Sequence, residues 1–227
     1  MSTSNPTDLE QARFNMVEQQ IRTWDVLDPE ILELLFAVKR EEFVPAPYRS
    51  LAFADLEIPL AGAKSPGPRM WAPKLEARAV QELRLLPADE VLEIGTGSGY
   101  LTALLARRSA SVTSVEIDPG LAASAAAKLA SHDVSNARVE AGDGSRGWAS
   151  GRQFDAIVIT GSTPLLPEAF THQLKPGGRL FAIVGVEPAM HGRLVIRDES
   201  GDLVATDLFE TVVAPLVNAL QPERFVF

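Results

Sequence analysis

The stretch VLEIGTGSGY, residues 91–100, decides the fold of this chain. It opens with the apolar pattern of a buried strand, interrupted by Glu93, and continues with three glycines at alternate positions, Gly95, Gly97 and Gly99. Glycines at this spacing let the backbone turn tightly and let a ligand approach it closely. A helix that begins directly after them presents free N–H groups and positive potential at its first turn. The stretch therefore predicts a strand, a ligand-binding turn and a helix start that favours a carboxylate-bearing ligand.

Strand and helix patterns alternate around this stretch. Apolar strands are expected over residues 91–95, 111–117, 137–141, 154–160 and 179–185. Helices are expected before and between them, over residues 73–86, 98–108, 119–131 and 167–174. Such alternation is typical of a parallel sheet with helices on both faces. Two further strand patterns about a glycine-containing turn, 193–197 and 203–213, predict an antiparallel hairpin at one edge. The predicted fold class is α/β, a doubly wound, mostly parallel sheet with an antiparallel C-terminal hairpin and an N-terminal helical extension.

The N-terminal extension lacks the alternation of strands and helices that the rest of the sequence shows. We expect residues 1–73 to form helices and a proline-rich loop that pack on a ligand-binding domain of residues 74–227, as one folded unit. Residues 43–73 contain six prolines, which predicts a long irregular loop of the kind that often carries binding function.

Two helices are predicted within this extension. A capping box at Thr7 starts a helix that runs to about Trp24. Asp28-Pro29 starts the second, with an aspartate cap and proline at the first helical position. Lys39 and Arg40 suit the C-terminal end of that second helix, because cations are favourable there.

The composition excludes several kinds of site. The 227 residues include no cysteine, so disulfides, thiolate metal sites and cysteine nucleophiles are ruled out. Only three histidines are present, His132, His172 and His191, and their separation does not suit a metal site. The 21 basic and 30 acidic residues give a net charge of −9, which argues against phosphate-driven binding of nucleic acid and against an anionic membrane surface. We expect no metal and no nucleic-acid or membrane partner.

The N-terminal residues and the hydropathy pattern bear on location. The stretch MSTSNPTDLEQ has neither the basic nor the apolar region of a signal peptide. No uninterrupted apolar run approaches the ~20 residues that span a bilayer. We therefore expect a cytoplasmic protein.

Acidic residues follow the next two predicted strands. Glu116 stands 21 residues after Gly95, close to the spacing of an acid that binds ribose hydroxyls. Asp143 follows the third strand, where its carboxylate suits an exocyclic amine such as that of adenine. Taken singly, these residues also suit a solvated strand end and an ordinary Asp-Gly turn. Tyr100 stands where the dinucleotide fingerprint needs its third glycine, so a nicotinamide-dependent oxidoreductase is the weakest alternative.

Several segments resemble one family of enzymes. The stretches VLEIGTGSGY, SVEID (114–118), the GDG turn and LKPGGRLF (174–181) resemble the S-adenosylmethionine-binding motifs of class I methyltransferases. More narrowly, the chain is similar to the protein-L-isoaspartate (D-aspartate) O-methyltransferase family over about residues 13 to 216. The segments that carry this similarity, in the family's order, are MVEQQI (16–21), EEFVPAPYRSLAFADLEIPL (41–60), DGSRGW (143–148) and FDAIVITGSTPLLPEAF (154–170).

The resemblance implies a Rossmann-like class I methyltransferase fold and S-adenosyl-L-methionine as cofactor. It places Glu93 and the glycine turn at the methionine part, Glu116 at the ribose, and Asp143 with Gly144 at the adenine. The full implied cofactor-binding set is Glu93, Gly95, Thr96, Gly97, Ser98, Gly99, Glu116, Ile117, Asp143 and Gly144.

One departure concerns the substrate. The family carries a serine implicated in catalysis just before the helix that precedes the first sheet strand. Registering Pro73 on that motif's proline places Trp71 on the serine, and Ser65 is a weak alternative, so the catalytic residue is left open. Arg69 and Lys74, which flank Trp71, are candidates to hold an acceptor carboxylate. The expected substrate pocket consists of Met70, Trp71, Thr160 and Ser162.

The resemblance implies methylation of a carboxylate of isoaspartyl residues in proteins or peptides, the step that starts repair of damaged Asp and Asn sites. A carboxylate acceptor is already ionised at neutral pH, so no general base is required. Two alternatives stay open. Trp71 favours a different acceptor on the same scaffold, a small molecule or another protein group, and intact cofactor motifs also suit a non-catalytic S-adenosylmethionine-binding module. The sequence does not indicate an oligomeric state.

Overall fold

The computed structural model describes residues 6–60, 67–149 and 151–223. Its centre is a seven-stranded sheet of order β5-β4-β3-β6-β7-β8-β9. The strands are β3 (Glu90–Ile94), β4 (Ser111–Glu116), β5 (Ala137–Ala141), β6 (Phe154–Thr163), β7 (Leu174–Val186), β8 (Ala189–Arg197) and β9 (Leu203–Thr211). The five strands β3 to β7 pair in parallel, whereas β8 and β9 pair antiparallel at one edge. The predicted α/β fold class, with its C-terminal hairpin, is confirmed.

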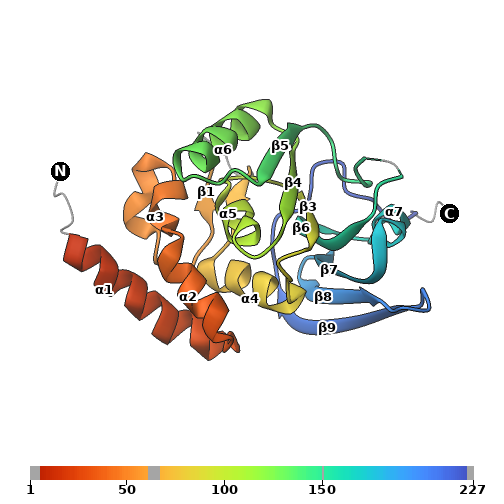
Figure 1. Ribbon diagram of the computed structural model, residues 1–227, viewed down its shortest axis with the longest axis horizontal. Coiled ribbons are helices and arrows are strands. Elements are labelled where there is room, and N and C mark those ends of the chain that lie inside the picture. Colours follow the sequence, from red (N-terminus) through yellow and green to blue (C-terminus); the bar gives the residue numbers. More distant parts are fainter. Residues whose placement is uncertain (1–5, 61–66, 150, 224–227) are drawn as a thin grey trace.

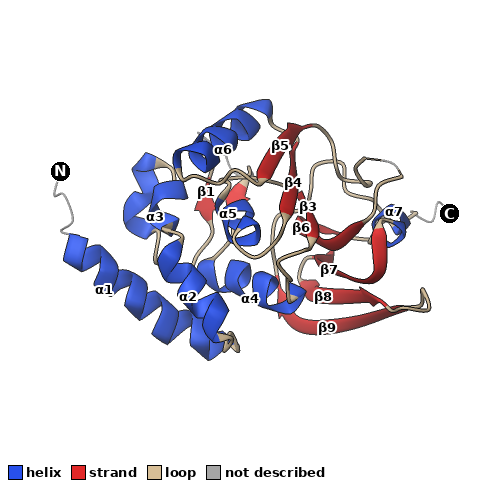
Figure 2. Ribbon diagram, in the orientation of Figure 1, coloured by secondary structure: helices blue, strands red, loops and turns tan. Residues whose placement is uncertain are grey.

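Helices cover the two faces of the sheet unequally. The helices that alternate with the strands are α4 (Pro73–Leu83), α5 (Tyr100–Ala106), α6 (Pro119–Ser131) and α7 (Glu168–His172). Helices α4, α5 and α6 lie on one side of the sheet together with the N-terminal helices, and α7 lies on the other side (Figures 1 and 2). The sheet therefore has a thick helical layer on one face and a thinner covering on the other.

Side chains of the central strand β6 alternate between these two faces, as the two-residue period of a strand requires. Ala156 and Val158 belong to the core under the helical layer. Ile157 and Ile159 belong to the second core, which Phe170 of α7 completes. This double burial explains why the strand reads as a continuous apolar run.

The first predicted helix is continuous in outline but changes its winding. It begins as α1 (Pro6–Met16), widens to a π-helical turn over Val17–Ile21 and tightens to a 3₁₀ turn over Arg22–Trp24. The next residue, Asp25, has a left-handed φ of 59° and ends it. The capping pattern at residue 7 concerns a side chain outside the described part of the chain.

The second helix, α2 (Pro29–Ala37), begins as predicted. The Asp28 side chain accepts a hydrogen bond from the Glu30 amide at 2.9 Å. The expectation that Arg40 sits at the C-terminal end of this helix is wrong. Val38 and Lys39 are extended, and Arg40 instead begins a short helix, α3 (Arg40–Phe43), with its side chain fully buried. A charge that finds partners in the interior outweighs the weak preference for a helix end.

The proline-rich region is more ordered than the predicted irregular loop. It contains a 3₁₀ turn over Ala46–Leu51 and a two-stranded antiparallel ribbon of β1 (Ile58–Pro59) and β2 (Arg69–Met70). Pro59 fits in the ribbon because a strand of so small a sheet has an edge that needs no N–H donor. The ribbon places β2 directly before α4.

The N-terminal extension shares its core with the sheet. Val17 and Ile21 are fully buried in the same cluster as Leu35 of α2 and Leu83 of α4. Trp24 packs on Phe209 of β9, with ring centroids 4.6 Å apart. Contacts of this kind join the N-terminal helices to the core of the sheet and to its β9 edge.

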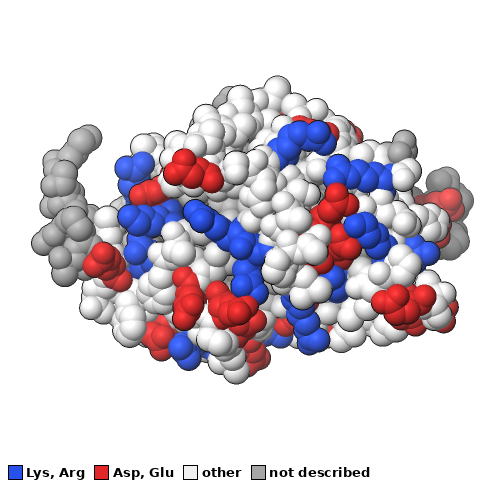
Figure 3. Space-filling view, viewed as in Figure 1, with Lys and Arg blue, Asp and Glu red and all other residues white. Residues whose placement is uncertain are grey.

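The charged side chains are mixed in sign over the visible surface. On the face drawn in Figure 3, basic and acidic residues lie interspersed rather than gathered in one continuous field. Among the described residues, no helix has the length and apolar character needed to cross a membrane.

Candidate functional site

The glycine turn lies at the carboxyl end of β3. Gly95, Gly97 and Gly99 have φ values of 94°, 54° and 84°, a region that L side chains rarely adopt. The Gly95 amide donates to the Val115 carbonyl oxygen at 2.7 Å, so the turn is fixed to the neighbouring strand β4. The glycines are therefore needed for the backbone path itself.

The glycine turn lies at the topological switch point of the sheet. From β3 the chain adds β4 and β5 on one side and then crosses to place β6 on the other side of β3. Crevices at such a switch point are the usual ligand sites of open α/β sheets. Thr160, at the end of β6, closes the crevice opposite Gly95, and its hydroxyl donates to the Gly95 carbonyl oxygen at 2.7 Å.

A small cavity of about 30 Å³ opens at this point. It joins the glycine turn to residues of β2 and α4 that are distant in sequence. Its lining is Arg69, Met70, Trp71, Glu76, Gly95, Thr96, Gly97, Ser98, Leu101 and Thr160. Met70, Trp71 and Thr160, three of the four residues expected in the substrate pocket, are thus brought to the glycine turn.

Glu116 lies beside this turn, at the end of β4. Its carboxylate accepts from the Gly97 amide at 2.8 Å and from the Asp118 amide at 3.0 Å. The next residue, Ile117, is 39% exposed, although it is large and apolar. An acid fixed by two backbone donors and an exposed apolar side chain thus stand next to each other at the carboxyl edge.

Asp143 lies at the end of the next strand, β5. Hydrogen bonds from the Ser145 amide at 2.9 Å and the Asn218 side chain at 2.8 Å hold the pKa of Asp143 below its ordinary value. The carboxylate is therefore ionised at neutral pH and accepts hydrogen bonds only. Gly144 is needed beside it because a Cβ there would lie 2.9 Å from the Ile94 side chain.

Glu93, which the resemblance places at the methionine part of the cofactor, is not among the residues that line the cavity. It is fully buried, on the side of β3 that faces α5. One carboxylate oxygen accepts from Thr102 at 2.5 Å and from Ser114 at 2.6 Å, and the other has no partner among the described residues. Burial raises the pKa of Glu93 to about 8. A strand ending in an acid does not reveal which face that acid occupies, so sequence reasoning could not separate this residue from Glu116.

Thr96 and Ser98, the other residues of the glycine turn, make hydrogen bonds inside the protein. The Thr96 and Ser114 hydroxyls lie 2.5 Å apart, which links the turn to the partners of Glu93. The Ser98 hydroxyl accepts from the Tyr100 amide at 3.2 Å. Both Thr96 and Ser98 are almost completely buried but reach the cavity wall with part of their surface.

Trp71 is a buried wall of the cavity. Its ring meets Phe181 of β7 edge-on, with centroids 6.4 Å apart, and its residue is 4% exposed. The packing accounts for a large aromatic residue here, and its indole offers only an N–H donor. Ser65 lies outside the described residues.

Ser162, the fourth residue expected in the substrate pocket, is not among the residues that line the cavity. Its side chain is fully buried and donates to the Val213 carbonyl oxygen at 3.0 Å. A register shift in the pairing of β6 with β7, between Ile159 and Ser162, turns this residue away from the path that Thr160 takes. Such a bulge has no signature in the sequence.

The segment after β9 was not anticipated as part of this region. It runs back along the carboxyl edge of the sheet, where the Leu216 amide donates to the Ser162 carbonyl oxygen at 2.9 Å. A Cβ on Gly161 would lie 2.8 Å from the Leu216 side chain, and Asn218 reaches Asp143 as described above. No sequence signal links this segment to the edge, because its contacts are made mainly through backbone groups and a single amide.

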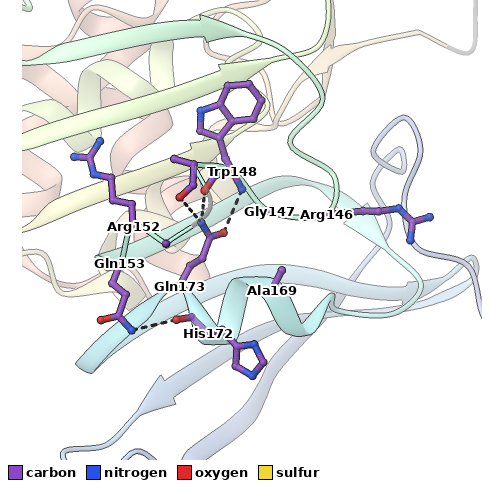
Figure 4. Close-up of a pocket in the computed structure, with 10 residues that line it drawn as sticks. Arg146, Gly147, Trp148, Arg152, Gln153, Ala169, His172 and Gln173 are labelled. Atoms are coloured by element: carbon purple, nitrogen blue, oxygen red, sulfur yellow. Dashed lines mark hydrogen bonds between the residues drawn. The ribbon is translucent and has the colours of Figure 1, made fainter.

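A larger hollow of about 520 Å³ lies elsewhere, between the loop around residues 146–153 and α7 (Figure 4). Gln173 crosses it, and its side chain accepts from the Trp148 amide at 3.2 Å. Gln153 and Gln173 flank the starts of β6 and β7, since Phe154 pairs with Leu174. The hollow is therefore at the amino edge of the sheet, away from the glycine turn. Among the described residues, no group of histidines and acids is placed to hold a metal ion.

Relatives of known name match this chain over most of its length. Protein-L-isoaspartate O-methyltransferase 1 of Anaeromyxobacter sp. (strain Fw109-5) is 38% identical over 205 residues, which cover 89% of this chain and 95% of the relative. Protein-L-isoaspartate O-methyltransferase of Rhodopseudomonas palustris (strain ATCC BAA-98 / CGA009) is 42% identical over 172 residues, 76% of this chain and 77% of the relative.

Solved structures share the fold. A Plasmodium falciparum structure described as a putative protein-L-isoaspartate O-methyltransferase in complex with S-adenosyl-L-homocysteine gives a TM-score of 0.74 at 17% identity, covering 92% of this chain and 97% of that one. A second protein-L-isoaspartate O-methyltransferase gives a TM-score of 0.76 at 24% identity, and the match spans 92% of this chain and 66% of that one.

The family itself is settled by the sequence match. The sequence model of the family described as Protein-L-isoaspartate(D-aspartate) O-methyltransferase matches residues 11–221. The match includes the N-terminal extension, the glycine turn and the segment after β9. The chain therefore belongs to the protein-L-isoaspartate(D-aspartate) O-methyltransferase family.

Proposed function

We propose that this chain is an S-adenosylmethionine-dependent methyltransferase that esterifies the carboxylate of isoaspartyl residues in proteins or peptides. The observation that carries the proposal is the cavity that the glycine turn shares with Trp71, at the same edge of the sheet that carries Glu116 and Asp143. Membership of the family supports the same activity.

The residues at this edge fit the expected cofactor. Gly95, Gly97 and Gly99 carry no side chain, so a ligand can approach the backbone of the turn closely. We assign Gly95 to Gly99 to the methionine part, Glu116 and Ile117 to the ribose and its surroundings, and Asp143 with Gly144 to the adenine. In this assignment Glu93 does not touch the cofactor. It supports the site indirectly, by accepting hydrogen bonds from the Thr102 and Ser114 side chains. When bound, S-adenosylmethionine supplies a methyl group activated by a positively charged sulfur.

The chain itself has to align the acceptor and exclude water. An isoaspartyl carboxylate is ionised at neutral pH, so alignment replaces the need for a general base. Met70 and Trp71 provide buried apolar walls on the acceptor side of the cavity. Burial of this kind strengthens any charge-assisted contact made to the acceptor.

Arg69 is our assignment for the residue that holds the acceptor carboxylate. Arg69 is one of the residues that line the cavity, and its guanidinium lies 4.0 Å from the Glu57 carboxylate, beyond hydrogen-bond distance. Lys74, the other candidate, is engaged elsewhere: its ammonium lies 2.7 Å from Asp55 and 5.0 Å from the centre of the Trp24 ring. Arg69 is therefore the better placed of the two.

Trp71 supports a second candidate function, transfer of the methyl group to a different acceptor. The residue replaces a family serine and is buried against Phe181, so it contributes shape where a hydroxyl is expected. A small molecule or another protein group is the acceptor in that case.

One assay pair separates the candidates. Transfer of tritiated methyl from S-adenosylmethionine is measured to an isoaspartyl peptide and to its normal aspartyl twin. Transfer to the first peptide alone supports the proposal, and transfer to neither refutes it. Calorimetry with S-adenosylhomocysteine then distinguishes an enzyme with another acceptor, or a binding module, from a chain that does not bind the cofactor.

We also infer that residues 1–73 and 74–227 act as one unit. The supporting observation is their common core, in which residues of α2 and α4 pack together. Met70 and Trp71 come from the first part and the glycine turn from the second, so the site needs both.

A further inference from the structure

Arg40 is the largest fully buried side chain of the described residues, and it is charged. It belongs to α3, in the N-terminal extension, and lies under the helical layer. Burial lowers the pKa of Arg40 to about 10, which leaves the guanidinium protonated at neutral pH. A buried cation of this kind needs an anion and further acceptors around it.

The Arg40 guanidinium binds two residues that line the cavity, Glu76 and Trp71, and one further carbonyl oxygen. One terminal nitrogen is ion-paired with Glu76, which itself lines the cavity. The other donates to the main-chain carbonyl oxygen of Trp71 at 2.6 Å. The Nε–H donates to the Ala52 carbonyl oxygen at 2.9 Å. One side chain thus fixes both the backbone of residues 69–72, here called the acceptor segment, and the first turn of α4.

The flat face of the Arg40 guanidinium packs against Tyr100, the residue that follows the glycine turn. Its central carbon lies 5.1 Å from the centre of the Tyr100 ring, a cation–π distance. Tyr100 is fully buried and follows Gly99 directly as the first residue of α5. The Phe43 ring packs on Tyr100 from the other direction, with centroids 5.7 Å apart.

We propose that Arg40 is a positioning residue that sets the distance between the acceptor segment and the glycine turn. It is the contact through which the Trp71 carbonyl, Glu76 and Tyr100 are held in one arrangement. The inference rests on the proposed methyl transfer, where the acceptor oxygen, the methyl carbon and the sulfur have to lie in line. Misplacement of reacting groups by about 1 Å can cost roughly 100-fold in rate.

A second buried ion pair in the same layer provides a matched control. Arg13 pairs with Glu41, and both side chains are almost completely buried. Arg13 also faces the Phe53 ring at 5.5 Å. Its ion-pair partner Glu41 and its ring contact Phe53 belong to the N-terminal extension and not to the acceptor segment or the cavity lining. Loss of either pair removes a buried interaction, but only loss of the Arg40 pair releases the acceptor segment.

The experiment compares Arg40→Lys with Arg13→Lys in the full chain. Lysine keeps the charge and loses the planar fork that binds three acceptors at once. For Arg40→Lys we expect kcat with the isoaspartyl peptide to fall at least tenfold, while the Kd of S-adenosylhomocysteine changes less than threefold. For Arg13→Lys we expect kcat within twofold of the original at a similar loss of melting temperature. Equal kcat in the two variants overturns the proposal.

Two further arms keep the test decisive. If Arg40→Lys does not fold, Glu76→Gln removes the ion pair at nearly constant shape; a tenfold fall in kcat supports the proposal and an unchanged kcat overturns it. If the original chain does not methylate the peptide, the proposed function fails on its own. Hydrogen exchange then tests Arg40: S-adenosylhomocysteine should protect the amides of residues 70–72 and 95–100 in the original chain, but only those of 95–100 in Arg40→Lys. Protection of both segments in the variant refutes the coupling.

Discussion

The hydroxyl oxygen of Thr160 stands 2.2 Å from the position that a Cβ atom on Gly95 would take. The two residues come from neighbouring parallel strands, and the same hydroxyl donates to the Gly95 carbonyl oxygen. At the base of the crevice between β3 and β6, the Thr160 side chain therefore fills the space that a side chain on residue 95 would need. Any enlargement at either residue has to open the sheet or the turn.

Gly95→Ala should abolish measurable binding of S-adenosylhomocysteine, because the added methyl meets Thr160 and residue 95 has a φ of 94°. Gly201→Ala is the matched control, since Gly201 also has a φ of 94° but a Cβ there finds no atom closer than 3.8 Å. We expect this control to lose about 1–2 kcal/mol of stability from backbone strain and to keep its affinity. Equal affinities in calorimetry would show that the clash is harmless.

Glu116→Ala should weaken binding of S-adenosylhomocysteine by about 1–3 kcal/mol, the scale for losing charged hydrogen bonds, or roughly 5- to 150-fold in Kd. The carboxylate also accepts from the Gly97 amide, so part of the loss comes from a looser turn. Glu210→Gln, on the exposed side of β9, serves as the control and should leave Kd unchanged. An unaltered Kd for Glu116→Ala would remove Glu116 from the cofactor site.

Arg69→Met should raise KM for the acceptor peptide about 10- to 100-fold and leave the affinity for S-adenosylhomocysteine as it was, because only the acceptor carboxylate loses its partner. Lys74→Met is matched in chemistry but removes a side chain already paired with Asp55, so its KM should change less than threefold. Steady-state kinetics decide the matter. The opposite ranking of the two variants would transfer the role to Lys74.

Trp71→Ser should cost about 3–5 kcal/mol of stability in urea unfolding, since it empties a buried site against Phe181. Trp71→Phe keeps an aromatic ring and should lose less. If residue 71 selects the acceptor, the serine variant should show a higher ratio of kcat/KM for isoaspartyl over aspartyl peptide than the phenylalanine variant. Identical ratios in the three proteins would mean that selectivity lies elsewhere.

Glu93→Gln should flatten the pH dependence of stability between about pH 5 and pH 8. Burial raises the pKa of Glu93 from 4.5 to about 8, so the folded state holds a proton that the unfolded state releases. The stabilisation is complete below the unfolded pKa and is lost as the pH rises through the folded value. Melting temperatures of the original chain should therefore fall over this window relative to the glutamine variant. Parallel curves would show that Glu93 titrates normally.

The elements that form the sheet could be predicted because their signals are local. Alternating burial, capping residues and glycine turns lie within about ten residues of one another, as at residues 91–100. The parallel pairing of the central strands also followed, since βαβ units impose a parallel crossover. The position of the glycine turn, Glu116 and Asp143 at the carboxyl ends of β3, β4 and β5 could be predicted in the same way, and this edge is where open α/β sheets usually bind ligands.

The residues whose surroundings the sequence did not reveal share a common property. Glu93, Ser162 and Arg40 are each polar residues whose burial depends on partners far away in the sequence. The partners of Glu93 come from α5 and β4, and those of Arg40 from three separate segments. A pattern of one sequence reports how polar a residue is, but not whether the fold brings it a partner.

The contacts of the segment after β9 determine when the carboxyl edge of the sheet can be completed during synthesis. Asn218 and its partner Asp143 are 75 residues apart, and the Leu216 amide donates to the Ser162 carbonyl oxygen from 54 residues further along the chain. During synthesis the glycine turn, Glu116 and Asp143 leave the ribosome long before Asn218 does. A nascent chain that ends at β9 therefore lacks the hydrogen bond from Asn218 to Asp143, and the carboxyl edge of the sheet reaches its final form only after residues 216–218 have been synthesised.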